Sequence, residues 1–191
     1  MTDAATERAE EKAQYLTFFV QEEEYAIEIL RVKEILRYET LTRVPMTPQY
    51  IRGVMNVRGS VVPVIDLGVK FGLESSPVTK WTCIVVVQVL VDGEEVAFGL
   101  LADAVSQVVN LPKSEVEPPP AFGTTARADC LKGMGRLGAK FALILDIDRV
   151  LATDEVLSQA ALASAGVAPG GSPMVGSTAE DTDAAAEGVR Q

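Results

Sequence analysis

The feature that most constrains the fold of this chain is an internal duplication. Residues 51–67, IRGVMNVRGSVVPVIDL, match residues 131–147, LKGMGRLGAKFALILDI, without a gap. The matched positions include two glycines and two aspartates: Gly53 with Gly133 and Asp66 with Asp146. An earlier segment, residues 18–30, matches residues 89–101 in the same way. Duplication explains these matches better than chance similarity between valine-rich strands, so we expect two related halves.

Polar residues that only one half retains are the candidates for function, because residues retained by both halves are best explained by folding. In these comparisons Glu34 corresponds to Val105, and Arg58 corresponds to Gly138. Taken singly, Arg58 would be an ordinary exposed turn residue and Glu34 an ordinary solvated charge. Taken with the asymmetry, both become candidate interaction residues, and we hypothesise that they form a half-exposed ion pair. Such a pair adds only about 0–1 kcal/mol to folding, so a role in stability alone would be weak.

Alternating apolar residues and turn pairs predict a chain made mainly of β-hairpins. The expected hairpins cover residues 15–29, 54–65, 82–101 and 131–145, and a further strand is expected over 105–110. Roughly five short strands per half predict two small barrels. Because neither half is large enough to be stable alone, we expect the barrels to share a core and to leave a groove at their junction.

Short irregular or helical segments are expected between the strands. Thr47 followed by Pro48 is typical of a helix N-terminus and predicts a short helix that ends at Gly53. The remaining connections are expected as follows: a short irregular or helical segment over 30–38, a helical turn over 66–71, a long proline-rich loop over 113–129 and a C-terminal helix over 147–160.

The expected organisation is one folded unit over 14–160. Residues 1–13 are polar and residues 161–191 are rich in Ala, Gly and Ser, so we expect a disordered N-terminus and a flexible tail. Within the folded unit we expect three parts in order: a first barrel over about 14–73, a second barrel over about 80–146 and the C-terminal helix over 147–160.

The charge of the chain excludes several kinds of partner. The sequence has 27 Asp plus Glu against 17 Lys plus Arg, a formal net charge of -10, which repels nucleic acid phosphates and anionic lipid surfaces. No run reaches the roughly 18 apolar residues of a membrane span, and the N-terminus lacks the apolar stretch of a secretory signal. We therefore expect no nucleic acid partner, no direct membrane insertion and a cytoplasmic location.

The absence of histidine excludes many enzymes, because Ser-His-Asp and Cys-His nucleophile pairs cannot form. The sequence also lacks a GxxxxGK[ST] phosphate loop, a GxGxxG motif and a CxxC pair. We therefore expect no enzymatic activity, no catalytic residue, no cofactor and no metal site. Carboxylate chemistry through Asp66, Asp103 or Asp146 stays an alternative, although the equivalent positions of Asp66 and Asp146 favour a capping role. Cys83, in an apolar run, indicates a buried thiol.

Three segments carry a resemblance to a known family: residues 24–35, EYAIEILRVKEI; residues 47–67, TPQYIRGVMNVRGSVVPVIDL; and residues 98–108, FGLLADAVSQV. Together they resemble the CheW-like coupling proteins of bacterial chemotaxis, and the resemblance runs from about Tyr15 to Leu151. It implies a mainly β fold of two intertwined five-stranded SH3-like β-barrels with short helices and a C-terminal helix.

The resemblance also implies a function. The chain would be a non-enzymatic scaffold or adaptor that couples methyl-accepting chemoreceptors to a CheA-type histidine kinase in signalling arrays. One surface would bind the regulatory domain of the kinase, which is itself CheW-like. The groove between the barrels would bind the cytoplasmic tip of the receptor, and the chain would be recruited to membrane-associated receptor arrays.

In the resembled family the positions that match Glu34 and Arg58 lie near that groove. A receptor tip is a helical bundle with an apolar stripe and charged flanks, so the groove needs apolar side chains for burial and a few charges for register. Gly53, matched by Gly133, is expected to act through the backbone. The expected receptor and kinase interaction residues are Glu34, Arg58, Val32, Gly53, Val54, Val57 and Val105.

Two alternatives stay open for the function. The first is a CheW-like adaptor in a related non-flagellar pathway that controls pili, development or a second messenger. The second is of a different class: a carboxylate-based enzyme, or a small-ligand sensor with a pocket in a barrel. The tail is expected to be an inert extension, or alternatively a tether for another partner.

Overall fold

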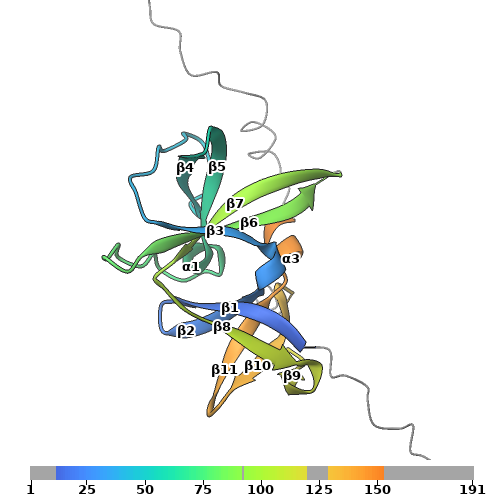
Figure 1. Ribbon diagram of the computed structural model, residues 1–191. Coiled ribbons are helices and arrows are strands. Elements are labelled where there is room, and N and C mark those ends of the chain that lie inside the picture. Colours follow the sequence, from blue (N-terminus) through green and yellow to red (C-terminus); the bar gives the residue numbers. More distant parts are fainter. Residues whose placement is uncertain (1–11, 92, 120–128, 153–191) are drawn as a thin grey trace, which may run out of the picture.

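Two β-sheets and a few short helices make up the computed structural model, which describes residues 12–91, 93–119 and 129–152 (Figure 1). The strands are β1 (Lys12–Val20), β2 (Glu23–Glu28), β3 (Val32–Arg37), β4 (Ile51–Val57), β5 (Ser60–Asp66), β6 (Cys83–Val91), β7 (Glu94–Ala102), β8 (Ala104–Pro112), β9 (Val116–Glu117), β10 (Leu131–Leu137) and β11 (Lys140–Leu145). The helices are α1 (Leu67–Lys70) and α3 (Ile147–Leu151), with 3₁₀ turns η1 (Ile29–Arg31) and η2 (Lys113–Glu115). The expected mainly β class is confirmed.

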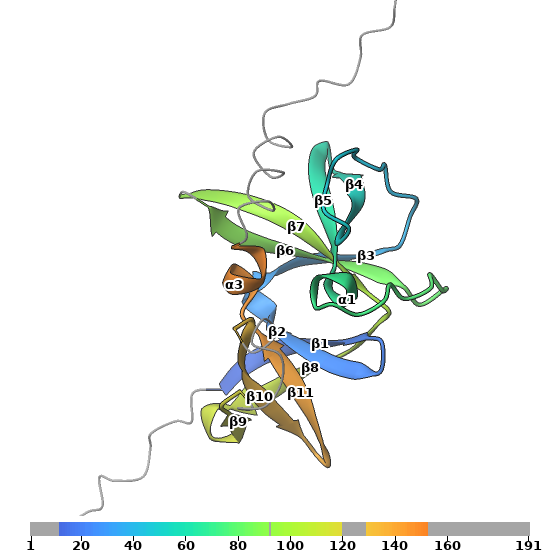
Figure 2. The same ribbon diagram turned by 180° about the vertical axis from the view of Figure 1, so that it is seen from behind.

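The strands form one sheet at each end of the molecule. The five-stranded sheet has the order β3-β6-β7-β5-β4, and the six-stranded sheet has the order β8-β1-β2-β11-β10-β9. The first lies at the top of Figure 1 and the second at the bottom, and the view from behind in Figure 2 agrees. The helices α1 and α3 lie near the junction between the sheets.

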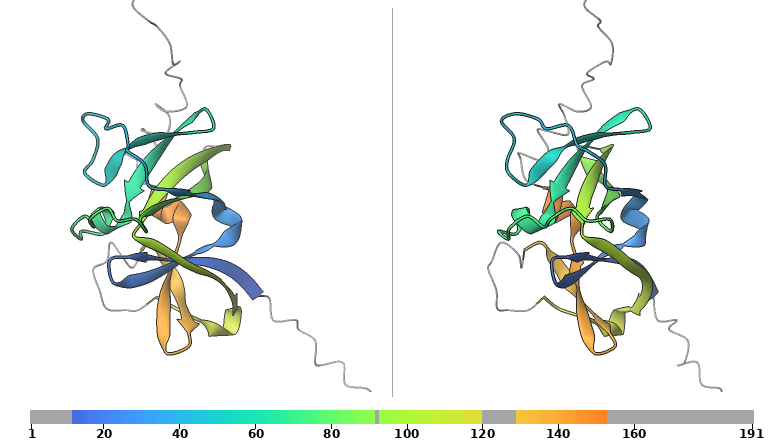
Figure 3. Two further views of the ribbon diagram at one scale, coloured as in Figure 1. Left: turned by 60° about the vertical axis from the view of Figure 1, so that its left-hand side comes forward. Right: turned by 90° about the vertical axis from the view of Figure 1, so that its left-hand side faces the viewer.

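The sheets show that the two halves of the chain exchange hairpins. The β1–β2 hairpin of the first half lies in the six-stranded sheet, and the β6–β7 hairpin of the second half lies in the five-stranded sheet. The side views in Figure 3 show the two sheets as separate layers that the chain crosses repeatedly. The bounds expected for the two barrels, 14–73 and 80–146, therefore do not correspond to the sheets, because each sheet takes strands from both halves.

The duplication is visible in the topology. The order β8-β1-β2-β11-β10 corresponds strand for strand to β3-β6-β7-β5-β4. In each sheet one strand of the exchanged hairpin pairs in parallel with a strand of the other half: β2 with β11, and β7 with β5. The molecule therefore consists of two interlocked units with the same strand order, as the repeated sequence predicts.

The repeated hairpins share a bulge. The pairing register shifts between Ile51 and Gly53 in β4, and between Leu131 and Gly133 in β10. An unpaired residue of this kind bends its strand and increases the local twist. The two glycines that the sequence comparison aligns therefore sit at the same structural irregularity.

The repeated hairpins also share a helix cap. Asp66 Oδ1 accepts a hydrogen bond from the backbone N–H of Val69 at 3.1 Å, at the start of α1. Asp146 Oδ1 accepts one from the backbone N–H of Arg149 at 3.2 Å, at the start of α3. An aspartate at this position satisfies a helix N–H that has no intrahelical partner. The capping role predicted for both aspartates is confirmed.

The largest part of the core lies between the two sheets. It is built from fully buried residues of both, among them Phe18 and Tyr25 from one sheet and Val85 and Phe98 from the other. The rings of Phe18 and Tyr25 stack with their centroids 6.2 Å apart. Each sheet has its own smaller cluster in addition. Because the main cluster needs both sheets, the expected shared core is confirmed.

One connection expected to be irregular or helical is a strand. Within residues 30–38, η1 ends at Arg31 and β3 then pairs antiparallel with β6. Val32 and Ile35 are β-branched residues that suit a strand, and burial alternates along β3 as it does in a strand with one buried face. The contact with β6, which lies far away in the sequence, outweighs the local helical spacing.

The short helix expected at 47–53 is absent. The backbone N–H of Ile51 donates to the carbonyl oxygen of Pro48 at 2.9 Å, which closes a single turn, and β4 begins at Ile51. Pairing with β5 fixes Ile51 and Gly53 in a strand, so a helix cannot continue through them. The proline marks the turn before a strand rather than the first position of a helix.

The remaining expectations concern the two ends of the chain and the loop after β8. Lys12 and Ala13 belong to β1 and pair with β8, so the expected disorder of residues 1–13 is wrong for these two. The expected loop over 113–129 contains η2 and β9 in its described part. The expected C-terminal helix over 147–160 begins at Ile147 as α3 and ends at Leu151, with Ala152 as its C-cap. Residues 153–160 and the expected tail lie outside the described residues.

Candidate functional site

The two asymmetric charged residues form the ion pair that the sequence predicts. Arg58 Nη2 donates to Glu34 Oε2 at 3.1 Å. The Arg58 side chain is 81% exposed, whereas the Glu34 side chain is 16% exposed. The Glu34 carboxylate is therefore mostly enclosed by the protein, whereas most of the Arg58 guanidinium faces solvent. The remaining N–H donors of the guanidinium are available to another molecule.

The geometry of the β4–β5 turn presents Arg58 outward. Arg58 has φ 52° and Gly59 has φ 89°, so both central residues of this two-residue turn lie in the left-handed region. Turns with two such residues match the twist of a hairpin. The backbone N–H of Gly59 donates to Asn56 Oδ1 at 2.8 Å, which fixes the turn further. A bulky residue in this conformation is uncommon, since Asn, Asp or Gly is the usual choice.

The ion pair joins two distant parts of one sheet. Glu34 lies on β3 and Arg58 follows β4, and these strands are the opposite edges of the five-stranded sheet. The pair therefore shows that the sheet curls enough to bring its edges toward each other. Ile35, the residue after Glu34, is 45% exposed. Because successive side chains of a strand point to opposite faces, the exposed Ile35 lies on the other face of β3 from Glu34.

The other predicted site residues are not all brought together. Val32 and Val105 are partly buried against the shared core, and Val57 is buried. Val54 is half-buried on β4, where it pairs with Pro63 of β5. Val105 lies in the six-stranded sheet, opposite Phe18. These four valines thus lie on β3, β4 and β8, and the groove expected between them stays a prediction.

One of the two sequence comparisons behind the site is wrong in register. Glu34 pairs with Val86 of β6, and Val105 pairs with Phe18 of β1. In the alignment of residues 18–30 with residues 89–101, Phe18 corresponds to Val89 and not to Val86. The strand partners of Val105 and Glu34 therefore do not correspond, so Val105 is not the structural counterpart of Glu34. The second comparison is correct, because Arg58 and Gly138 are both the first residue of a hairpin turn and both have positive φ.

Gly53 has the backbone role that the sequence predicts. Its φ is 145°, and a Cβ atom at this position would lie 2.5 Å from the carbonyl oxygen of Thr42. The segment before β4 crosses Gly53 and forms a bridge between Thr42 and Val54. Real Cβ atoms do not approach this closely, so the crossing requires glycine.

A second surface was not foreseen from the sequence. A pocket of ≈ 600 Å³ lies where β1 begins, between η1, η2 and β10, and we call it the lysine pocket. Its lining includes Lys12, Tyr15, Glu28, Leu30, Lys113 and Lys132. Leu30 is 92% exposed beside it. The three lysines are far apart in the sequence, so only the fold shows that they converge.

The electrostatics of the lysine pocket support this convergence. Lys132 Nζ donates to Glu28 Oε1, and this hydrogen bond raises the pKa of Lys132. Burial raises the pKa of the Tyr15 hydroxyl and so does Glu28, whereas the charges of Lys132 and Lys113 lower it. Two lysine charges therefore act on one buried hydroxyl.

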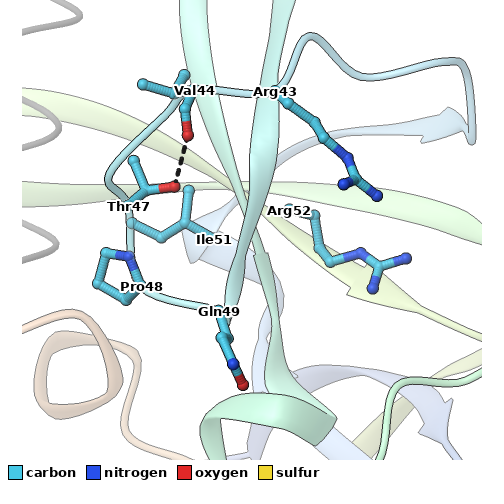
Figure 4. A pocket seen from close by; sticks show the side chains of 7 residues that line it. All are labelled: Arg43, Val44, Thr47, Pro48, Gln49, Ile51 and Arg52. Atoms are coloured by element: carbon cyan, nitrogen blue, oxygen red, sulfur yellow. Dashed lines mark hydrogen bonds between the residues drawn. The ribbon is translucent and has the colours of Figure 1, made fainter.

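A smaller pocket of ≈ 280 Å³ lies beside the loop that leads into β4 (Figure 4). Its charged lining residues are Arg43 and Arg52, which extend to the same side in this view. Arg52 Nη1 donates to Ser75 Oγ at 2.7 Å and lies 3.8 Å from Asp66 Oδ2. Neither of the two pockets is lined by any of the seven predicted site residues.

The carboxylates considered for catalysis have structural partners. Asp66 is buried, caps α1 and accepts a hydrogen bond from Ser75 Oγ at 2.8 Å. Asp146 caps α3. Asp103 Oδ2 accepts hydrogen bonds from the backbone N–H of Gln21 and from Ser76 Oγ. The contacts of Asp66 and Asp103 join separate chain segments and that of Asp146 caps a helix, so all three have folding roles rather than those of a paired acid and base.

Neither cysteine thiol is activated. Cys83 is buried and Cys130 half-buried, both are free, and burial raises the pKa of each thiol, which lowers its reactivity. Among residues 12–91, 93–119 and 129–152, no group of three or more acidic, cysteine or histidine side chains is placed to hold a metal ion. Within the same ranges no helix has the length and apolar character that crossing a membrane requires.

Known proteins match both the sequence and the fold. The model of the CheW-like domain family matches residues 14–155. Chemotaxis protein CheW of Klebsiella aerogenes is 37% identical over 143 residues, which cover 75% of this chain and 84% of that protein. Chemotaxis protein CheW of Helicobacter pylori is 33% identical over 145 residues, which cover 76% of this chain and 85% of that protein.

Two further matches extend the comparison. Protein FrzA of Myxococcus xanthus is 30% identical over 151 residues, which cover 78% of this chain and 92% of that protein. The crystal structure of the scaffolding protein TtCheW from Thermoanaerobacter tengcongensis superposes with a TM-score of 0.65 at 29% identity, and the match covers 75% of this chain and 95% of that one. The two-sheet arrangement is consistent with paired SH3-like barrels.

Proposed function

Because this chain belongs to the CheW-like domain family, whose matched members are chemotaxis and scaffolding proteins rather than enzymes, we propose that it couples two signalling partners. The first partner is the cytoplasmic helical tip of a methyl-accepting chemoreceptor. The second is the regulatory domain of a CheA-type histidine kinase. The chain acts by holding both at a fixed geometry, which raises their effective concentration without any turnover of its own.

The observation that carries this proposal is the Glu34–Arg58 pair on the five-stranded sheet. Arg58 is held in an unusual turn conformation and is largely exposed, yet an exposed ion pair contributes only about 0–1 kcal/mol to folding. A costly conformation with a small folding benefit indicates a role in recognition.

An adaptor needs a second surface, and the lysine pocket supplies a candidate. Leu30 is almost fully exposed beside a pocket large enough to accept several side chains. The exposed leucine side chain provides apolar area that a partner bound in this partly apolar pocket would bury. We assign the kinase regulatory domain to this surface and the receptor tip to the Glu34–Arg58 surface. The chain would then act on the cytoplasmic side of membrane-associated receptor arrays.

The test is a reconstitution with purified kinase and receptor signalling fragments. Arg58→Glu places two carboxylates opposite each other and should weaken receptor binding about tenfold or more, with the melting temperature shifted by no more than a few degrees. Leu30→Glu should weaken binding of the kinase regulatory domain and spare the receptor. Receptor-dependent kinase activity should fall in both variants.

The control is the Arg136–Glu117 pair, which has the same chemistry in the other sheet. Its charged atoms lie 2.8 Å apart and both side chains are exposed. Arg136→Glu should leave receptor binding unchanged. An equal loss in Arg58→Glu and Arg136→Glu would show a general charge effect, and a collapse of the melt with normal binding of the folded fraction would show that the Glu34–Arg58 pair serves folding.

A related non-flagellar pathway is the second candidate. The match to Protein FrzA favours it, since that relative is not named as a chemotaxis protein and is covered over most of its length. The same adaptor chemistry would serve either pathway. Identification of the receptor and kinase that co-purify with the chain from native lysate separates the two.

A further inference from the structure

The smaller pocket, beside the loop that leads into β4, carries two positive charges on a strongly acidic protein, and we call it the arginine pocket. Two of its described lining residues are the arginines Arg43 and Arg52, and none of them is acidic. The two arginine side chains extend to the same side in Figure 4. In a chain with a net charge of -10, a concave site with this lining favours an anion as its ligand.

The two guanidinium groups retain hydrogen-bond donors for such an anion. The exposed Arg43 side chain forms no hydrogen bond or ion pair with the described residues. Arg52 donates through Nη1 to Ser75 Oγ, and the same nitrogen lies 3.8 Å from Asp66 Oδ2, so its charge is partly balanced. Both contacts use Nη1, which leaves the Nη2 group of Arg52 available. A guanidinium fork binds a carboxylate through two parallel hydrogen bonds.

The turn beside the arginine pocket adds an exposed apolar side chain in a strained conformation. Thr47 Oγ1 donates to the carbonyl oxygen of Val44 at 2.9 Å, across a turn with Pro45 and Met46 at its centre. Met46 has φ 61°, and a turn with positive φ at this position normally has glycine or asparagine there. The Met46 side chain is fully exposed, so burial does not offset the strain. A strained residue without a packing role favours recognition over folding.

We propose that the arginine pocket binds a carboxylate of an acidic protein segment. The carboxylate of an Asp or Glu side chain accepts hydrogen bonds from Arg43 and Arg52, and an apolar side chain next to it in the segment packs on Met46. The occupant is a protein segment rather than a free anion, because a free anion cannot use the apolar surface of Met46. The site goes beyond the proposed function, since it shares no residue with the Glu34–Arg58 pair or the lysine pocket.

An NMR titration of the full chain with short peptides tests the site. The probe is acetyl-Leu-Glu-Leu amide, and acetyl-Leu-Gln-Leu amide is its uncharged control. The glutamate peptide should shift the Nε–Hε resonances of Arg43 and Arg52 and leave that of Arg37, an exposed arginine of β3, in place. The glutamine peptide should bind about fivefold more weakly or worse, because the charge-assisted hydrogen bonds are lost. Equal binding of the two peptides overturns the carboxylate site.

Two variants with the same change in net charge separate the pocket from the general field of the protein. Arg43→Gln should weaken binding of the glutamate peptide about fivefold or more, and Arg37→Gln should leave it unchanged. Neither arginine side chain has a hydrogen bond or ion pair with the described residues, so both variants should keep the melting temperature of the original chain. Equal weakening by the two variants overturns the proposal, because it shows a general charge effect.

The variant Met46→Gly distinguishes a protein segment from a free anion. Glycine suits φ 61°, so the melting temperature should fall by no more than a few degrees. Binding of the glutamate peptide should weaken about threefold or more, because its apolar contact is lost, whereas the weaker binding of sodium acetate should stay unchanged. If Met46→Gly keeps the full peptide affinity, or if acetate binds as tightly as the peptide, the acidic segment is refuted. These titrations contain no receptor or kinase, so their failure leaves the proposed function intact.

Discussion

The β4–β5–α1 and β10–β11–α3 units have the same arrangement, and their comparison separates the residues that the fold requires from those that it leaves free to differ. Both have a bulge at a glycine and an aspartate that caps the next helix. They differ at the hairpin turn, where the first unit has Arg58 and the second has Gly138. Backbone geometry explains the glycine and the aspartate that both units share. Arg58, the turn residue that only the first unit has, points into solvent.

The glycines at the two bulges provide the largest expected effect. Gly53→Ala should destabilise the protein by about 2–4 kcal/mol, because a Cβ atom would lie 2.5 Å from the carbonyl oxygen of Thr42 and the φ of 145° is unfavourable for alanine. Gly133→Ala should cost less, about 1–3 kcal/mol, because its φ is ordinary and its closest contacts, at 2.8 Å, include a side chain. Urea unfolding measures both free energies.

A third glycine separates the clash from the backbone strain. Gly59 has φ 89° with open space around it, so Gly59→Ala tests the strain alone and should cost about 1 kcal/mol. If Gly53→Ala costs no more than Gly59→Ala, the crossing of the Thr42 segment is not what requires glycine at the bulge.

The two capping aspartates come next in size. Asp66→Ala should cost about 2–3 kcal/mol, since it removes the cap of α1 and also the buried acceptor of Ser75. Asp146→Ala should cost about 1 kcal/mol, because this side chain is more exposed and its further partner is the solvent-exposed Arg149. Thermal melts of the two variants, with ΔΔG taken at one temperature, measure the difference.

Substitution by asparagine checks the origin of that difference. Asparagine is a good helix cap, so Asp146→Asn should recover most of the loss. Asp66→Asn should recover less, because Arg52 then loses its nearby carboxylate. Equal losses for Asp66→Ala and Asp146→Ala would mean that the additional contacts of Asp66 add nothing to its cap.

Local elements of this fold could be predicted from the sequence, and long-range pairings could not. The hairpin turns, the helix caps and the glycine at the bulge depend on residues close together in the chain. The strand β3 was missed because its partner β6 is distant, and pairing with it overrides local spacing. The bounds expected for the two barrels missed the exchange of hairpins for the same reason, since two contiguous barrels have the same local pattern, and intertwined barrels were expected only from the family resemblance.

One part of the candidate site could likewise be predicted from the sequence, and another could not. The Glu34–Arg58 pair could be predicted because a repeat exposes what only one copy has, although the comparison that singled out Glu34 was shifted in register. The lysine pocket left no signal in the sequence. Lys12, Lys113 and Lys132 lie at separate points of the chain, and none occurs in a basic run that could have drawn attention to it.

The smallest effect on stability is expected at the turn that distinguishes the two units. Arg58→Gly makes the first turn resemble the second, where Gly138 has φ 63°. Glycine relieves the cost of an arginine at φ 52°, whereas the greater freedom of the unfolded chain and the loss of the ion pair act in the opposite direction. These contributions are each about 1 kcal/mol or less, so the melting temperature should change by no more than a few degrees.

Receptor binding should nevertheless fall about as far as in Arg58→Ala, because the turn is retained and the guanidinium is not. Full receptor binding by Arg58→Gly would show that the shape of the turn, rather than its charge, is what a partner recognises, and the two units would then be equivalent in this respect as well.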